Sequence, residues 1–276
     1  MEAATDTIAG PAAVATRRRA ADHRAVAAEG RALPQLKLRG IIAVWAAAAL
    51  PMALLAWVGA PLLADHLSGP GALPRALILT LTAGLVWQGV LVMFLVRREQ
   101  GTLRWSVLRE ALWLRAPRSP RTGRRGGRLW LIVIPLIVAF GIEELLPGPG
   151  APATRDMGEF LGSHAGHTVL AGAWGWLAVL VVLWVFNTVV GEELLFRGYL
   201  LPRMNGVFGR RDWLANGVLF AVYHLHIPWA IPATLLDSFI LSYPSKRYRS
   251  ALIGIVVHSA QSVVLFGLVL ALVLNG

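Results

Sequence analysis

Residues 169–198 read VLAGAWGWLAVLVVLWVFNTVVGEELLFRG, an apolar run of membrane-spanning length that ends in a charged string. A helix needs about 20 apolar residues to cross roughly 30 Å of hydrocarbon. An ionisable side chain at that depth costs about 2.5–3.5 kcal/mol on insertion scales. A span that keeps Glu192, Glu193 and Arg197 therefore needs a structural or a chemical reason to keep them.

The rest of the chain is also unusually apolar. Of its 276 residues, 56% are hydrophobic and 15% are charged, whereas a soluble domain carries about 25% charged residues. We predict an all-α integral membrane protein, a bundle of seven to eight transmembrane helices. The higher number applies if Glu192–Met204 forms a separate short helix. The predicted spans are residues 41–63, 76–96, 129–146, 169–191, 214–224, 231–241 and 251–274.

The N-terminal region differs from these apolar blocks. Residues 1–40 are basic and contain no long apolar run, so we predict a tail that is disordered or lies on a membrane surface, ahead of a membrane domain over residues 41–276. Such a tail is attracted to anionic lipids. The formal net charge is +11, but the other basic residues sit between apolar blocks. We expect them to set topology and not to bind nucleic acid.

Arginine is distributed unevenly over the connections between the predicted spans. It crowds residues 17–39, 97–128, 203–211 and 246–249, and it is sparse in residues 64–74 and 147–167. Basic connections stay in the cytoplasm. We therefore expect a multi-pass protein of the cell membrane, with the N-terminus and residues 97–128 and 203–211 in the cytoplasm.

The charged string contains a predicted ion pair and a second acid. Glu193 and Arg197 are four residues apart with the acid first, which is the favoured order for a helical ion pair. Glu192 lies about 100° round the helix from Glu193. One carboxylate can then be neutralised while the other stays free for acid–base chemistry.

Two histidines lie at a depth similar to that of Glu192. Measured from the nearest basic residue by helical rise, Glu192, His224 and His258 lie about 16, 20 and 13 Å into the membrane. Three separate helices would thus place ionisable groups in one layer. A buried structural ion pair and packed histidines are the plain alternatives.

Two neighbouring features are predicted to have no chemical role. Glu143 and Glu144 also precede two leucines, but no arginine follows four residues on, and Pro147 ends the helix. We interpret them as a pair at the membrane boundary. His226 points away from His224 if both are helical, so an interfacial position is expected.

Three strings carry a resemblance to a known family. Glu192-Glu193-x-x-x-Arg197, Phe220-x-x-x-His224 and His258-x-x-x-Ser262 resemble, in order and spacing, the motifs of the CPBP family. This family groups type II CaaX prenyl endopeptidases with bacteriocin-processing and self-immunity proteins. The similarity spans roughly residues 129–274.

The resemblance implies about eight helices around a polar cavity that is open to the cytoplasm. It implies that Glu192 activates water, that His224 and His258 assist, and that Glu193 and Arg197 hold the site. Ser262 stands where family members commonly carry Asn, which makes Ser262 the candidate for supporting the oxyanion.

The expected function is an intramembrane endopeptidase that cleaves a peptide or lipidated protein within the membrane. Glu192, His224 and His258 are a ligand set that zinc or another divalent metal accepts, and a metal-free mechanism is equally compatible. The alternatives are a non-catalytic scaffold or immunity protein on the same fold, a b-type cytochrome with two axial histidines and a proton-coupled transporter.

Overall fold

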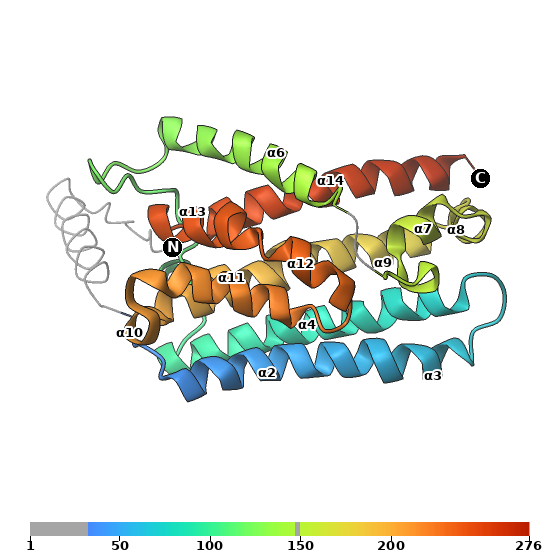
Figure 1. Cartoon of the computed structure of the whole chain (residues 1–276), viewed down its shortest axis with the longest axis horizontal. Helices are drawn as coiled ribbons and strands as arrows, with labels where there is room; N and C mark the ends of the chain where they lie inside the picture. Colours follow the sequence, from blue (N-terminus) through green and yellow to red (C-terminus); the bar gives the residue numbers. More distant parts are fainter. Residues whose placement is uncertain (1–32, 147–149, 276) are drawn as a thin grey trace, which may run out of the picture. The chain divides into compact units, whose positions relative to one another are not determined.

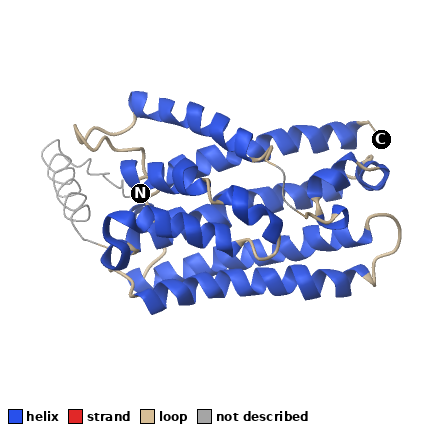
Figure 2. Cartoon of the chain, viewed as in Figure 1, coloured by secondary structure: helices blue, strands red, loops and turns tan. Residues whose placement is uncertain are grey.

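The computed structural model describes residues 33–146 and 150–275. The chain forms two units, residues 1–34 and residues 35–276, so the predicted basic tail lies largely outside the described residues. The second unit is built from helices and turns, and its described part contains no strand beyond an isolated bridge (Figure 2). The all-α prediction is confirmed.

Four helices are long and apolar enough to cross a membrane. They cover Leu38–Ala64, Ala72–Gln100, Trp174–Arg203 and Ala251–Leu274. In Figure 1 these are α2 (Leu38–Leu54) with α3 (Ala60–Ala64), α4 (Ala72–Gln100), the helix that starts as α9 (Trp174–Val185), and α14 (Ala251–Leu274). Their number, length and composition indicate a multi-pass membrane protein.

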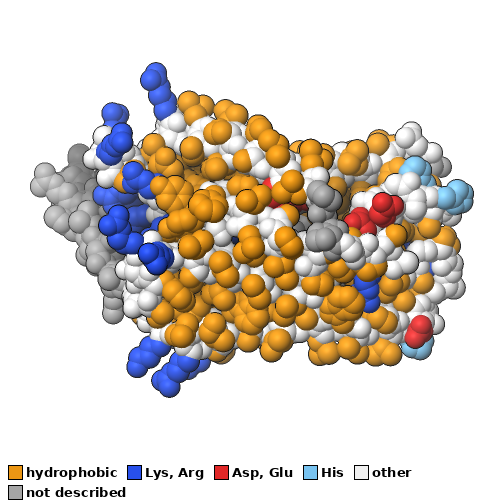
Figure 3. Space-filling model, in the orientation of Figure 1, with side chains coloured by type: hydrophobic (Ala, Val, Ile, Leu, Met, Phe, Trp, Pro, Cys, Tyr) orange, Lys and Arg blue, Asp and Glu red, His pale blue; other side chains and the backbone are white. Residues whose placement is uncertain are grey.

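The outer faces of these helices support the same conclusion. Leu54, Phe94 and Val263 are large apolar side chains that are 62%, 59% and 70% exposed. Hydrophobic side chains cover most of the face drawn in Figure 3. A continuous apolar surface of this kind matches lipid and not water.

The predicted spans at residues 129–146 and 214–224 are shorter than expected. Helix α6 (Val133–Glu143) has 11 residues and α11 (Asp212–Tyr223) has 12. The chain turns away after α11, before Pro228, so neither α-helix reaches the length of a full span. The other short α-helices are α5 (Trp105–Ala111), α7 (Met157–Gly162), α8 (His164–Leu170), α10 (Asn205–Phe208), α12 (Ile231–Thr234) and α13 (Tyr243–Tyr248).

The span that carries the charged string is one continuous helix from Trp174 to Arg203. Residues 192–204 therefore do not begin a separate short helix. Two wider π-helical stretches, Phe186–Gly191 and Leu194–Leu200, interrupt its α-helical geometry. Such π stretches often mark functional sites, and Glu192 and Glu193 lie between these two.

A glycine allows this span to pack closely on α4. A Cβ atom at Gly191 would lie 2.5 Å from the Phe186 carbonyl oxygen and 3.2 Å from the Leu85 carbonyl oxygen of α4. Only glycine fits there without a shift of the backbone. The residue before Glu192 thus sets how deeply the site is packed into the bundle.

The arginine-rich connections meet at one end of the bundle. Arg203 pairs with Glu99, Lys246 pairs with Asp212, and the Arg118 amide donates to the Tyr248 carbonyl. Figure 3 shows Lys and Arg side chains gathered at this end of the face drawn. The connection between α3 and α4, together with α7 and α8, lies at the other end (Figure 1). The basic and non-basic connections therefore alternate between the two ends.

Candidate active site

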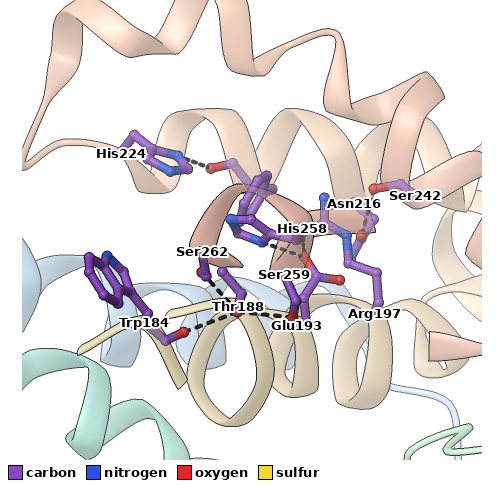
Figure 4. Close-up of polar contacts among 11 residues, drawn as sticks. Trp184, Thr188, Glu193, Arg197, Asn216, His224, Ser242, His258, Ser259 and Ser262 are labelled. Carbon is purple, nitrogen blue, oxygen red and sulfur yellow. Dashed lines mark hydrogen bonds and ion pairs between the residues drawn. The ribbon is translucent and has the colours of Figure 1, made fainter. Parts of the chain in front are cut away.

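Glu193 joins two of the three motifs. Its side chain is fully buried, and its Oε1 atom accepts hydrogen bonds from Arg197 Nη1 at 3.0 Å and from His258 Nδ1 at 3.2 Å (Figure 4). The ion pair expected between Glu193 and Arg197 is present. The bond to His258 was not foreseen. A carboxylate only accepts, so Nδ1 carries the proton in this contact, and Nε2 of His258 has a lone pair when the ring is neutral.

Phe220 joins the third motif to the other two. The Arg197 guanidinium lies 3.9 Å from the centroid of the Phe220 ring, and the Phe220 carbonyl accepts from His224 Nδ1 at 2.9 Å. The centroid of the Phe220 ring also lies 4.9 Å from that of His224 and 6.4 Å from that of His258. One aromatic side chain thus positions an arginine and both histidines.

The sequence predicted that His224 lies within a helix, and this prediction is wrong. Helix α11 ends at Tyr223, and His224 is its C-cap residue. Because the helical spacing no longer applies, His226 does not point away from His224, as helical geometry would require. His226 is 7% exposed and its ring stacks on His224 at 5.4 Å. Both imidazoles therefore turn into the protein.

Glu192 has a separate polar neighbourhood. It is 2% exposed and lies beside the Tyr223 hydroxyl. Gln88 Nε2 donates to that hydroxyl at 2.6 Å, so the Tyr223 O–H is free to point toward Glu192. Sequence reasoning overlooked Gln88, although a buried amide in the middle of an apolar span was a signal.

A cavity of about 310 Å³ brings the predicted groups together. Glu192, His224 and His258 all line it, each from a different helix or helix end. Glu193 and Arg197 lie behind it, where they hold His258 in place. The cavity is at the small end of the range for ligand pockets, and it is large enough for part of a peptide.

Comparison with known proteins places this arrangement in a family. Residues 174–264 match the family described as type II CAAX prenyl endopeptidase Rce1-like. The chain carries an Rce1-like domain. The matched residues contain all three motifs, and the family expected from those motifs is confirmed.

A distant relative matches part of the chain. The chain is 29% identical over 111 residues to UPF0177 protein YxdF of Lactococcus lactis subsp. lactis (strain IL1403). The alignment covers 40% of this chain and 60% of that relative, so the chain spans less than two thirds of its length. No solved structure matches the chain significantly.

The three predicted metal ligands reach the cavity from separate parts of the chain. Among residues 33–146 and 150–275, no three His, Cys, Asp or Glu side chains converge closely enough to hold a metal ion. Glu192, His224 and His258 line one cavity but do not form such a group.

Ser262 of the Rce1-like domain does not line the cavity. Its hydroxyl donates to Thr188 Oγ1 at 3.4 Å, within a small cluster that also contains Ser259 (Figure 4). Two amide side chains do line the cavity, namely those of Asn187 and Gln261. Asn187 lies on the π-helical stretch just before Glu192, and Gln261 follows His258 by three residues on α14.

At and beyond the ends of α6 and α11, the cavity is lined by Glu143, Glu144, Leu146, Ala151 and Asp156 and by residues between His226 and Thr234. Both helices start next to arginine-rich segments and run away from them (Figure 1). This part of the lining therefore lies away from the arginine-rich end. The expected opening toward the cytoplasm stays a prediction.

Gly254 allows Glu193 to lie against α14. A Cβ atom at Gly254 would overlap Glu193 Oε2 and lie 3.4 Å from Arg197 Cγ. Gly254 is four residues before His258, so it lies on the same face of the helix. On the same helix, Gly267 has open space around its Cα position.

Gly254→Ala is expected to lower the free energy of unfolding by about 1–3 kcal/mol, because the added methyl group displaces a fully buried ion pair. Gly267→Ala is the matched control. It gains the same helix propensity, up to about 1 kcal/mol, without a clash. Melting temperatures of the two detergent-extracted variants would check this. Equal melting temperatures would contradict the close packing of Glu193 on α14.

Proposed function

We propose that this chain is an intramembrane endopeptidase that hydrolyses a peptide bond of a membrane-associated substrate. The observation that carries the proposal is the convergence of Glu192, His224 and His258 on one cavity from three separate parts of the chain. Membership in the Rce1-like family supports it. A protein that used these motifs only for packing would not need free ring nitrogens beside a cavity.

Glu192 is the proposed general base. It takes a proton from a water molecule, whose oxygen attacks the carbonyl carbon of the scissile bond. Glu192 then returns the proton to the leaving nitrogen as the carbon–nitrogen bond breaks. The products are a carboxylate and an amine, so the reaction needs no further co-reactant.

The two histidines are proposed to hold the water and the peptide. Each uses Nδ1 for a bond within the protein, His224 to the Phe220 carbonyl and His258 to Glu193. Each therefore offers Nε2 as an acceptor in its neutral form. Glu193 orients His258 much as a third group orients the base in other hydrolytic sites.

The amides of Asn187 and Gln261 are the proposed oxyanion donors. Both line the cavity, and an amide N–H group can donate to the negative oxygen that develops during attack. They take the role that the family resemblance suggested for position 262. The experiment that tests the function is cleavage of membrane peptides by purified chain in proteoliposomes, with Glu192→Gln as the comparison.

The orientation of the chain is also a proposal. We place the arginine-rich end in the cytoplasm, as the distribution of basic residues favours. In this orientation, the lining residues at the ends of α6 and α11 lie toward the non-cytoplasmic half of the membrane.

Because the chain contains no cysteine, single introduced cysteines can test this orientation. A membrane-impermeant maleimide is expected to label Glu159→Cys in intact cells. It should label Arg121→Cys and Arg210→Cys only after permeabilisation. All three side chains are exposed. The reverse pattern would invert the proposed topology.

A further inference from the structure

We propose that the cavity recognises a cationic group of the substrate, a Lys or Arg side chain close to the scissile bond, through Glu143, Glu144 and Asp156. This inference rests on the proposed function, and it names the class of substrate that the site would take. It gives a role to the second Glu-Glu pair, which sequence reasoning assigned to the membrane boundary.

Helix α6 brings this pair to the catalytic residues. The Phe140 ring meets the His258 ring edge-on, with centroids 5.3 Å apart. Glu143 follows Phe140 by three residues and so lies on the same face of the helix. Its side chain is 6% exposed and lines the cavity together with Glu144. The end of α6 therefore forms a wall of the catalytic cavity.

The ionisable side chains that line this cavity are acids and histidines, although the chain as a whole is basic. Glu143, Glu144, Asp156 and Glu192 line it, and none of its described lining residues is Lys or Arg. The chain as a whole has a formal net charge of +11. An acidic cavity in a basic protein favours a positive ligand, because charges are screened weakly in such a low-dielectric setting.

Arg155 and Arg197 do not neutralise these carboxylates from within the cavity. Arg197 pairs with Glu193 and lies over Phe220. Arg155 donates to the Ala56 carbonyl at 3.0 Å and stacks on Trp57 at 4.2 Å. Both guanidinium groups are thus held by partners outside the cavity lining.

His226 adds a buried imidazole to the lining. Its side chain lines the cavity, is 7% exposed, and its Nδ1 atom has no hydrogen-bond partner. A neutral imidazole offers one nitrogen as an acceptor. An ammonium carries three donors and a guanidinium five, which suits a cavity that is lined by carboxylates and imidazoles.

Trp229 adds an aromatic side chain to this lining. The face of a tryptophan ring attracts organic cations. A metal cation is a poorer match, because no three carboxylate or imidazole groups of the described residues converge on one point. The combination favours a side chain or amine of a peptide.

Binding can be measured without cleavage on the full chain carrying Glu192→Gln. The probes are two short apolar peptides of identical sequence with a central Lys or a central norleucine. The Lys peptide is expected to bind about tenfold more tightly, a difference of roughly 1.4 kcal/mol. Adding Glu143→Gln and Glu144→Gln should reduce this preference to about twofold or less. Glu159→Gln, an exposed acid outside the cavity, should leave the preference unchanged.

Equal binding of the two peptides would overturn the inference, and so would a preference that survives the double substitution. If the double variant does not fold, Glu144→Gln alone carries the test, because this side chain is exposed. A Lys preference in binding without cleavage by the unmodified chain would support the acidic subsite and refute the endopeptidase. Cleavage without a Lys preference would support the endopeptidase and refute the acidic subsite.

Discussion

Replacing Glu192 with glutamine is expected to reduce cleavage at least about 100-fold, the loss that follows removal of general-base assistance. Glutamine keeps the shape of the side chain but cannot accept the proton of water. Folding should change little, because a neutral amide is no harder to bury than a carboxylate. The measurement is the rate of peptide hydrolysis in proteoliposomes, with the melting temperature of the same preparation.

Glu159→Gln provides a control for loss of charge alone. It removes an exposed carboxylate that lies outside the cavity. It should cleave within about threefold of the unmodified chain. A stable Glu192→Gln variant with full activity would refute the glutamate mechanism. The non-catalytic scaffold would then be the better account of this fold.

The second large effect concerns stability. Glu193→Gln leaves the fully buried Arg197 without a charge partner. Breaking a buried ion pair in this way costs about 3–5 kcal/mol. The loss of stability should be larger still, because the carboxylate of Glu193 is also the hydrogen-bond acceptor of His258. The main result should be a lower melting temperature and less protein in the membrane, with loss of cleavage as a consequence.

Two comparisons separate this effect from a general loss of charge. Glu110→Gln breaks the partly exposed pair with Arg115, which should cost about 1 kcal/mol or less. Glu193→Gln combined with Arg197→Met removes both charges and should recover much of the stability lost by the single change. Cleavage should stay low in the double variant, because His258 still lacks its orienting carboxylate. A Glu193→Gln variant as stable as the unmodified chain would contradict the buried pair.

The sequence by itself determined the class of protein and the main chemical groups. Helices of spanning length follow from local apolar composition, so the four long helices were predictable. The Glu193–Arg197 pair was predictable because residues four apart on one helix are neighbours in any fold. The three motifs were sufficient to identify the Rce1-like family before any contact was known.

Only the tertiary structure decided which of these side chains line the cavity and which contact one another. His224 and His226 point into the cavity because α11 stops at Tyr223, and the end of a short helix depends on packing as well as on its own residues. Glu143 enters the site because α6 packs against His258. The bond between Glu193 and His258 joins residues 65 positions apart. Side-chain periodicity describes one helix at a time, so only the packing of helices on one another could show that Glu193 also holds the histidine of another helix.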